Sequence, residues 1–220
     1  SGRLGVVEAA EMPPTFGVNP NDFIGLIAGG NRALVKAVEG AEDQSKLAIQ
    51  DLKKHNFKSR DLLIAISASG TSEYVLSAIR KTSKAKAKSI FLTCNKIKNK
   101  ISDIDIVLNV GPEVIAGSTR LKSGTVTKIA LNIITTSAMM KANHTLNGLM
   151  IDIKPTTKKL KARSVNNLSQ LLNLPDSKCE KLLRNSNWNI RVAIIMSKMN
   201  LKYIEAKRIS KKINIKDLLK

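Results

Sequence analysis

Short apolar runs alternate with helix-like patterns along the first 150 residues of the chain. The apolar runs that predict strands lie at 23–28, 61–66, 89–94 and 104–110. Helical spacing of apolar residues occurs between and after them, at 31–38, 45–54, 73–83 and 125–141. The run at 61–66 is apolar almost throughout, which is typical of a parallel strand that is buried on both faces. This alternation predicts an α/β fold, a three-layer α/β/α sandwich around a parallel sheet.

The longest helical pattern runs from 125 to 141 and is expected to form one continuous helix. Its apolar residues include Ile129, Ile133, Ile134 and Ala138, which recur at helical spacing. Because a helix in such a sandwich buries its apolar side against the rest of the domain, we expect these four residues to face the core.

The character of the chain changes after Pro155. No strand-like run remains, and lysines interrupt short helical patterns at 165–172, 177–183, 189–196 and 204–209. These patterns predict a small helical bundle. We therefore expect two domains, residues 1–160 containing the sheet and residues 161–220 containing the small helices.

The chain carries a net charge of +20, and the positive charge is densest after Lys154. Such a charge suggests nucleic-acid binding. Aromatic residues make up only 3% of the sequence, however, which is too few for a base-stacking platform. We expect no specific nucleic-acid binding. We also expect no membrane association, because no apolar run approaches the roughly 18 residues that a span needs and the start lacks a signal-peptide pattern.

Two cysteines and two histidines limit the redox and metal chemistry. Cys94 and Cys179 lie far apart in unrelated contexts, which argues against a disulfide framework. Neither His55 nor His144 lies near a cysteine pair, so the sequence predicts no metal site. Both histidines are expected on solvated helix faces, and the expected setting is a reducing cytoplasm.

A turn rich in serine and glycine follows the buried strand at 61–66 and precedes a helix. In this turn, Ser67, Ser69 and Ser72 can donate hydrogen bonds, and Gly70 permits close approach of the backbone. Such a turn directs N–H groups and hydroxyls at a bound anion, assisted by the positive end of the helix dipole. It also lies at the carboxyl ends of parallel strands, where ligands bind. The pattern therefore predicts a phosphate-binding loop, although an ordinary capped turn has similar residues.

A second loop of this kind joins the last strand to the long helix. It spans 111–125 and contains Glu113, Ser118, Arg120 and Lys122. Its basic side chains could attract an anionic substrate, and a solvated basic loop is the alternative. Two polar loops at the same edge of one sheet favour a substrate site more strongly than either loop alone.

Three glutamates are candidates for proton transfer. Glu11 precedes a Pro-Pro pair, which restricts its backbone, while Glu39 and Glu42 lie three residues apart and would share one side of a helical turn. General acid–base catalysis needs one carboxyl group that accepts a proton and another that donates one. Solvated surface glutamates would have the same pattern.

Taken together, these segments resemble the N-acetylmuramic acid 6-phosphate etherase family, which is built on a sugar isomerase (SIS) domain and is related to the vertebrate glucokinase regulatory protein. The resemblance follows the chain in order, at 1–17, 25–30, 38–43, 67–72, 111–128 and 147–152. It implies that Glu11 and Glu42 are the catalytic glutamates and that Ser1 and Gly2 belong to the first phosphate loop. The C-terminal region resembles the family's small helical, UBA-like domain.

The resemblance also implies a reaction. The enzyme would be a carbon–oxygen lyase that cleaves the lactyl ether of N-acetylmuramic acid 6-phosphate, giving N-acetylglucosamine 6-phosphate and D-lactate. Glutamate acid–base chemistry would drive elimination and then hydration, with no metal or organic cofactor. The implied setting is a cytoplasmic homodimer in amino-sugar metabolism and peptidoglycan recycling.

The chain departs from the family pattern at several positions. Ser69-Gly70-Thr71-Ser72-Glu73 stands where the family usually has Ser-Gly-Arg-Thr-Pro, and Ala116 replaces a typical threonine. Family members also begin well before Ser1, with a core strand that would cover central apolar surface. We therefore expect the 220 residues alone to expose unpaired strand edges and to be inactive.

Three other functions share these features. The main alternative is a sugar-phosphate-binding regulator without catalysis, like the glucokinase regulatory protein. The others are an SIS-domain transcription factor, which would usually carry a helix-turn-helix, and an aldose–ketose isomerase, which would release no lactate. The presence of both Glu11 and Glu42 favours the etherase.

Overall fold

The computed structural model describes residues 1–210 and 212–219, and their contacts divide the chain into two compact units. Unit 1 comprises residues 1–10 and 24–133, and unit 2 comprises residues 11–23 and 134–220. The expected domain boundary near residue 160 remains a prediction.

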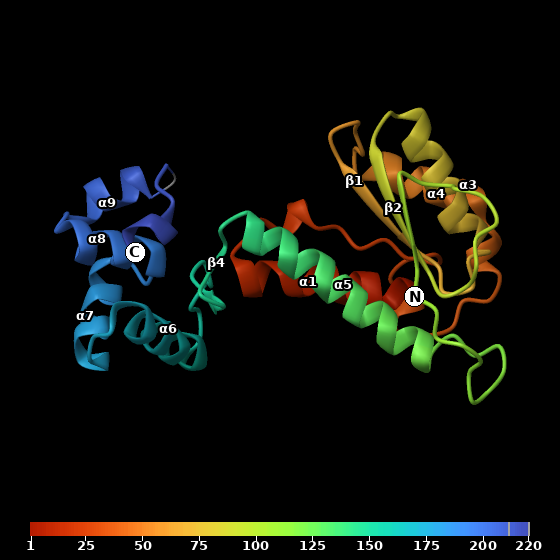
Figure 1. Ribbon diagram of the computed structural model, residues 1–220. Coiled ribbons are helices and arrows are strands. Elements are labelled where there is room, and N and C mark those ends of the chain that lie inside the picture. The colour runs from red at the N-terminus through yellow and green to blue at the C-terminus, as the bar shows by residue number, and fades with distance from the viewer. Residues whose placement is uncertain (211, 220) are drawn as a thin grey trace. The chain divides into compact units, whose positions relative to one another are not determined.

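Unit 1 contains a parallel sheet, as predicted. Its strands are β1 (Leu62–Ile66), β2 (Lys88–Thr93) and β3 (Ile104–Val107), in the spatial order β1-β2-β3 (Figure 1). The register pairs Ile64 with Ile90 and Leu92 with Ile106. Phe91 on the central strand is fully buried, which explains the apolar run there.

Helices cover both faces of this sheet. On one face, α4 (Glu73–Lys84) packs against Leu63 and Ala65 and also against α3 (Ser45–Lys54). On the other face, α1 (Gly2–Phe16) approaches Ile66 so closely that a Cβ at Gly5 would lie 3.1 Å from its Cδ1. Because alternate strand residues point to opposite faces, this arrangement is the predicted α/β sandwich.

Helix α1 was not predicted, because the pair Pro13-Pro14 indicates a break. Proline lacks the N–H that an interior helical position donates. Both prolines nevertheless lie within the last turn of α1, which is closed by a hydrogen bond from the Gly17 N–H to the Pro13 carbonyl at 2.9 Å.

The strand expected at 23–28 is wrong. This segment is irregular and pairs with no strand among the described residues. It packs against α1 instead, since a Cβ at Gly25 would lie 2.6 Å from the Cα of Val6. The helix expected at 31–38 shortens to α2 (Arg32–Val35).

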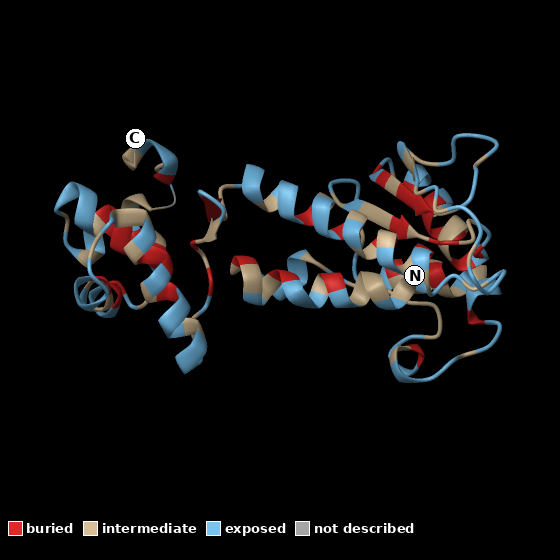
Figure 2. Ribbon diagram, turned by 60° about the horizontal axis from the view of Figure 1, so that its bottom comes forward, coloured by how far each residue is buried: buried red, intermediate tan, exposed pale blue. Residues whose placement is uncertain are grey.

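Helix α5 (Lys122–Lys141) confirms the longest helical pattern but not the expected inward face. Ile129 is 53% exposed and Ile133 is 61% exposed. The buried positions recur every four residues on another side of the helix (Figure 2), at Ser123, Thr127, Leu131 and Thr135. Hydroxyls can be buried here when they have a hydrogen-bond partner, as the Ser123 hydroxyl has in the Glu113 carboxylate at 2.9 Å.

Unit 2 contains the predicted helical bundle. From residue 145 on, the described residues form a short hairpin, four α-helices and a final 3₁₀ turn: β4 (Thr145–Leu146), β5 (Leu149–Met150), α6 (Lys158–Leu172), α7 (Asp176–Asn185), α8 (Ile190–Met199), α9 (Tyr203–Ile209) and η3 (Ile215–Leu218). The ends of α1 and α5 and the turn η1 (Pro20–Asp22) belong to the same unit. Helix α8 is the centre of its core, because Ile190, Ala193, Ile194 and Ile195 are all almost completely buried. Within the described residues, no helix combines the length and apolar character needed to cross a bilayer.

Candidate active site

The predicted phosphate loop connects β1 to α4 at the carboxyl edge of the sheet. Gly70 closes it as a turn: its N–H lies 3.0 Å from the Ser67 carbonyl and 3.1 Å from the Ser67 Oγ. The φ angle of Gly70 is +79°, in the left-handed region, and a Cβ there would lie 3.0 Å from Thr93 Oγ1. Glycine therefore fits this turn for both conformational and steric reasons.

The hydroxyls of the loop form a small network. Ser69 Oγ lies 3.3 Å from Ser67 Oγ and accepts hydrogen bonds from the N–H and hydroxyl of Thr71, at 3.3 and 3.0 Å. Asn95 holds the loop from the end of β2, since its Nδ2 donates to the Ser69 carbonyl at 2.9 Å. This network lies beside the N-terminus of α4, whose positive end favours an anion.

Two further segments of unit 1 meet this loop. Ser1 accepts a hydrogen bond from the Ala68 N–H at its Oγ, at 3.0 Å, and Gly2 begins α1 directly after it. Ser72 is buried and donates from its Oγ to the backbone carbonyl of Glu42 at 3.2 Å. The structure thus brings the predicted residues Ser1, Ser67–Ser72 and Glu42 together.

Glu42 lies in η2 (Ala41–Asp43), a short turn that follows Gly40. Its side chain is exposed, so the carboxylate is accessible to a solute. Glu39 is also exposed, but it lies before the turn. Glu11 lies on α1 within unit 2, where its side chain is exposed.

The second predicted loop is organised by Glu113. Its carboxylate accepts hydrogen bonds from the N–H groups of Lys122 and Ser123, at 3.1 and 2.8 Å, and from the Ser123 hydroxyl. These bonds, led by the one from the Ser123 N–H, hold the pKa of Glu113 below its usual value. Glu113 therefore binds the N-terminus of α5. Ser118 lies in the same loop, and within the described part of the chain no hydrogen bond joins it to the phosphate loop.

The added Glu73 at the start of α4 has its own partner. Its carboxylate forms an ion pair with Arg80 at 2.8 Å, about two turns further along the helix. This pairing offsets the negative charge that Glu73 places beside the phosphate loop.

Sequence reasoning did not identify two residues of this region. Asn95 could have been identified from the sequence, because it follows the strand β2, whose carboxyl end lies beside that of β1 at the edge where ligands bind. Glu8 is buried and its Oε2 lies 2.5 Å from Lys128 Nζ, which joins α1 to α5. In unit 2, by contrast, His144 lies outside any helix and bonds to Asp152 at 3.0 Å, so its expected place on a solvated helix face is wrong.

The parallel sheet with helices on both faces and a serine–glycine loop at its carboxyl edge defines an SIS-domain protein. Residues 1–83 match the family described as the glucokinase regulatory protein N-terminal SIS domain. The chain is also 43% identical over 208 residues to the N-acetylmuramic acid 6-phosphate etherase of Alkaliphilus metalliredigens, covering 94% of this chain and 68% of the relative. It therefore belongs to the N-acetylmuramic acid 6-phosphate etherase family.

Other members of the family give similar values. An etherase of Bacillus licheniformis is 45% identical over 202 residues, which cover 91% of this chain and 66% of that protein. An etherase of Staphylococcus epidermidis is 44% identical over 198 residues, which cover 89% and 67%. The chain thus spans about two thirds of the length of these relatives.

Proposed function

We propose that the protein is a carbon–oxygen lyase that converts N-acetylmuramic acid 6-phosphate into N-acetylglucosamine 6-phosphate and D-lactate. The observation that carries this proposal is the identity of 43–45% to named etherases over about nine tenths of the chain. The bond between Ser72 and the Glu42 turn supports it, because it sets a free carboxylate next to a phosphate cradle.

In the proposed reaction, the loop at Ser67–Ser72 binds the 6-phosphate through its N–H groups and hydroxyls. The sugar reacts in its open-chain form, in which the C1 aldehyde acidifies the proton on C2. The Glu42 carboxylate removes this proton, and the electron pair forms the C2–C3 double bond as the C3–O bond breaks.

Lactate leaves with the electrons of the C3–O bond and takes a proton from Glu11. Water then adds to the unsaturated aldehyde, with its hydroxyl bonding to C3 and a proton returning to C2. The division of roles between Glu11 and Glu42 rests on the resemblance to the family. Glu113 and Ser118 would complete substrate binding from the second loop. By the same resemblance, we propose a cytoplasmic homodimer that serves amino-sugar metabolism and peptidoglycan recycling.

The test is an assay of D-lactate release from N-acetylmuramic acid 6-phosphate. It compares the 220-residue chain with a form extended at its N-terminus to the length of its relatives. We expect turnover in the extended form and its loss in Glu11→Gln and Glu42→Gln. Glu39→Gln is the matched control, since Glu39 is an exposed glutamate close to Glu42 in the sequence, and it should retain activity.

Isotopes test the chemistry separately. In heavy water the product should gain deuterium at C2, and in ¹⁸O-labelled water it should gain the label at the C3 hydroxyl. Label in lactate instead of the sugar would contradict cleavage of the C3–O bond. If the extended form binds the sugar phosphate but releases no lactate, the non-catalytic regulator becomes the better proposal.

A further inference from the structure

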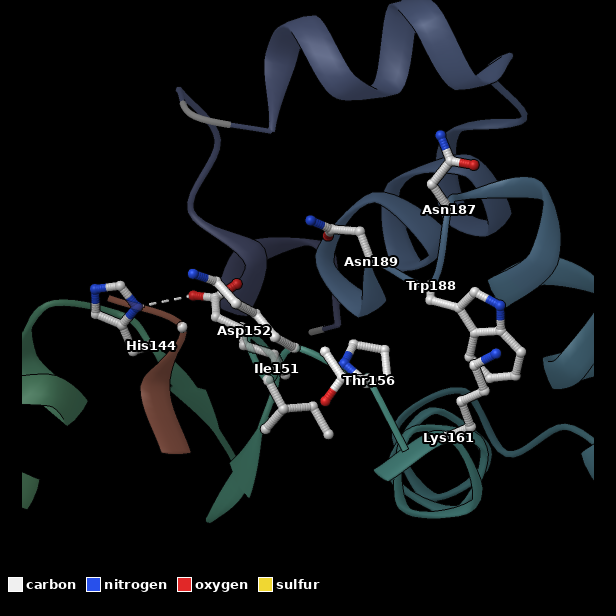
Figure 3. A pocket seen from close by; sticks show the side chains of 12 residues that line it. His144, Ile151, Asp152, Thr156, Lys161, Asn187, Trp188 and Asn189 are labelled. Atoms are coloured by element: carbon white, nitrogen blue, oxygen red, sulfur yellow. Dashed lines mark hydrogen bonds and ion pairs between the residues drawn. The ribbon is translucent and has the colours of Figure 1, made fainter. Parts of the chain in front are cut away.

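A cleft of about 700 Å³ lies in unit 2, away from the residues of the phosphate loop in the sequence. It is formed by the segment after β5, the first turn of α6 and the turn between α7 and α8. His144 and Asp152 lie at one side of the view in Figure 3, and Lys161 and Trp188 lie at the other. No step of the proposed reaction uses this cleft.

The hydrogen-bond acceptors that line the cleft are largely engaged by the protein itself. The Asp152 carboxylate accepts two hydrogen bonds from Arg191, at 2.6 and 3.0 Å, and contacts His144 Nδ1 at 3.0 Å. Asn189 caps α8, because its Oδ1 accepts a hydrogen bond from the Val192 N–H at 2.9 Å. The sole carboxylate of the lining is thus neutralised.

The donors of the lining remain available. The Lys154 ammonium has no hydrogen bond or ion pair with another described residue, and the Thr156 hydroxyl has none either. Lys161 Nζ lies 5.0 Å from the centre of the Trp188 ring, so its positive charge rests on an aromatic face and not on a carboxylate. The Nδ2 of Asn189 adds a further donor. A lining with spare donors and no spare carboxylate favours an anion.

The backbone at the cleft is strained. Trp188 has a φ angle of +60° and follows Asn187, whose φ angle is +52°. A left-handed conformation is rare for a large side chain and is often found where a ligand is held. A hydrogen bond from the Trp188 N–H to the Leu183 carbonyl, at 2.6 Å, fixes this turn. The turn places the indole in the cleft lining, in contact with Lys161.

We propose that this cleft is a second anion site, which binds the phosphate group of a small phosphorylated metabolite through Lys154 and Lys161. A phosphate has several terminal oxygens, which match the number of free donors better than the two oxygens of a carboxylate. Thr156 and Asn189 supply the neutral donors.

Trp188 makes the proposal directly measurable, because it is the only tryptophan in the sequence. A bound phosphate should draw the Lys161 ammonium away from the ring and change the tryptophan emission. The experiment titrates the full chain with inorganic phosphate and with N-acetylglucosamine 6-phosphate, at an ionic strength held constant with chloride. Equilibrium dialysis with radioactive phosphate measures binding without relying on fluorescence.

We expect saturable binding that weakens at least about tenfold in Lys154→Ala and Lys161→Ala, since hydrogen bonds to charged groups contribute enough for such a change. Lys198→Ala is the control, because Lys198 is an exposed lysine of α8 outside the cleft, and it should bind as the unaltered chain does. Circular dichroism checks that each variant is folded.

Ser67→Ala separates this site from the phosphate loop: it should reduce lactate release by the extended form but leave the Trp188 response intact. If Lys198→Ala weakens phosphate binding as much as Lys161→Ala does, the phosphate is attracted to the basic surface in general, and the proposal is overturned. Absence of saturable binding by dialysis would overturn it too. Neither result would affect the etherase assay, so the two proposals fail separately.

Discussion

Replacing Gly17 with alanine should destabilise unit 2 through a backbone collision. Gly17 follows α1 with a φ angle of +67°, and a Cβ there would lie 2.0 Å from the backbone oxygen of Asp152. Observed Cβ atoms essentially never come closer than 3.0 Å to another heavy atom. The Asp152 segment would therefore have to move by about 1 Å to admit the methyl group, given the dense packing of protein interiors.

Two contributions set the size of the effect. A left-handed conformation costs an alanine about 1 kcal/mol. Moving Asp152 also disturbs its bonds to Arg191 and His144, and breaking a well-buried ion pair costs about 3 kcal/mol. Because the Asp152 and Arg191 side chains are only 18% and 17% exposed, little of this is lost to solvent screening. We expect a total loss of about 3 kcal/mol in the free energy of unfolding, allowing for partial relaxation.

Gly148→Ala is the matched control within the same unit. Gly148 has a φ angle of +76°, but an added Cβ would meet nothing within 4 Å. It should therefore cost only the conformational part, about 1 kcal/mol. The assay is urea unfolding followed by Trp188 emission, which reports on unit 2 alone because no other tryptophan is present. Equal losses in the two variants would refute the steric argument.

Three further predictions concern unit 1 and the tyrosines. The hydrogen bonds from α5 lower the pKa of Glu113. The contribution of the Glu113 carboxylate to the free energy of unfolding is therefore complete above the usual pKa of about 4.3 and is lost as pH falls through the lowered pKa. In Glu113→Ala, the free energy of unfolding should depend less on pH in this acid range. Ultraviolet titration of the two tyrosines should give two pKa values on either side of the usual value of about 10. The pKa of Tyr203 should be lower, because its hydroxyl accepts a hydrogen bond from an asparagine. The pKa of Tyr74 should be higher, because Tyr74 is buried and lies against Asp51. Asp51→Asn should lower the Tyr74 value and leave the other unchanged. Phe91→Ala should cost about 3–5 kcal/mol in urea unfolding, because Phe91 is fully buried on the central strand.

The sequence by itself determined the parallel sheet, most of its helices and the place of the serine–glycine loop after β1. These depend on local properties. The continuous apolar run at 61–66 favours a strand, although Leu62 is 52% exposed and only Ala65 of β1 is buried, and a serine–glycine turn after a parallel strand lies at the carboxyl edge of the sheet. For the same reason the four small C-terminal helices were predicted near their observed positions. The link between Ser72 and the Glu42 turn lies at this edge, although the sequence alone did not predict the bond.

Only the tertiary structure decided which surfaces these elements bury. The sequence pattern of α5 allows either of two sides of the helix to face inward. Packing against the neighbouring segments buries the side with Ser123 and Leu131, and leaves the side with Ile129 and Ile133 exposed. A strand also needs a neighbouring strand to pair with. The apolar run at 23–28 packs on helix α1 and is paired with no strand of the described residues, so it does not form a strand. The cleft beside Trp188 depends on contacts between segments more than 25 residues apart, and no local pattern contains that information.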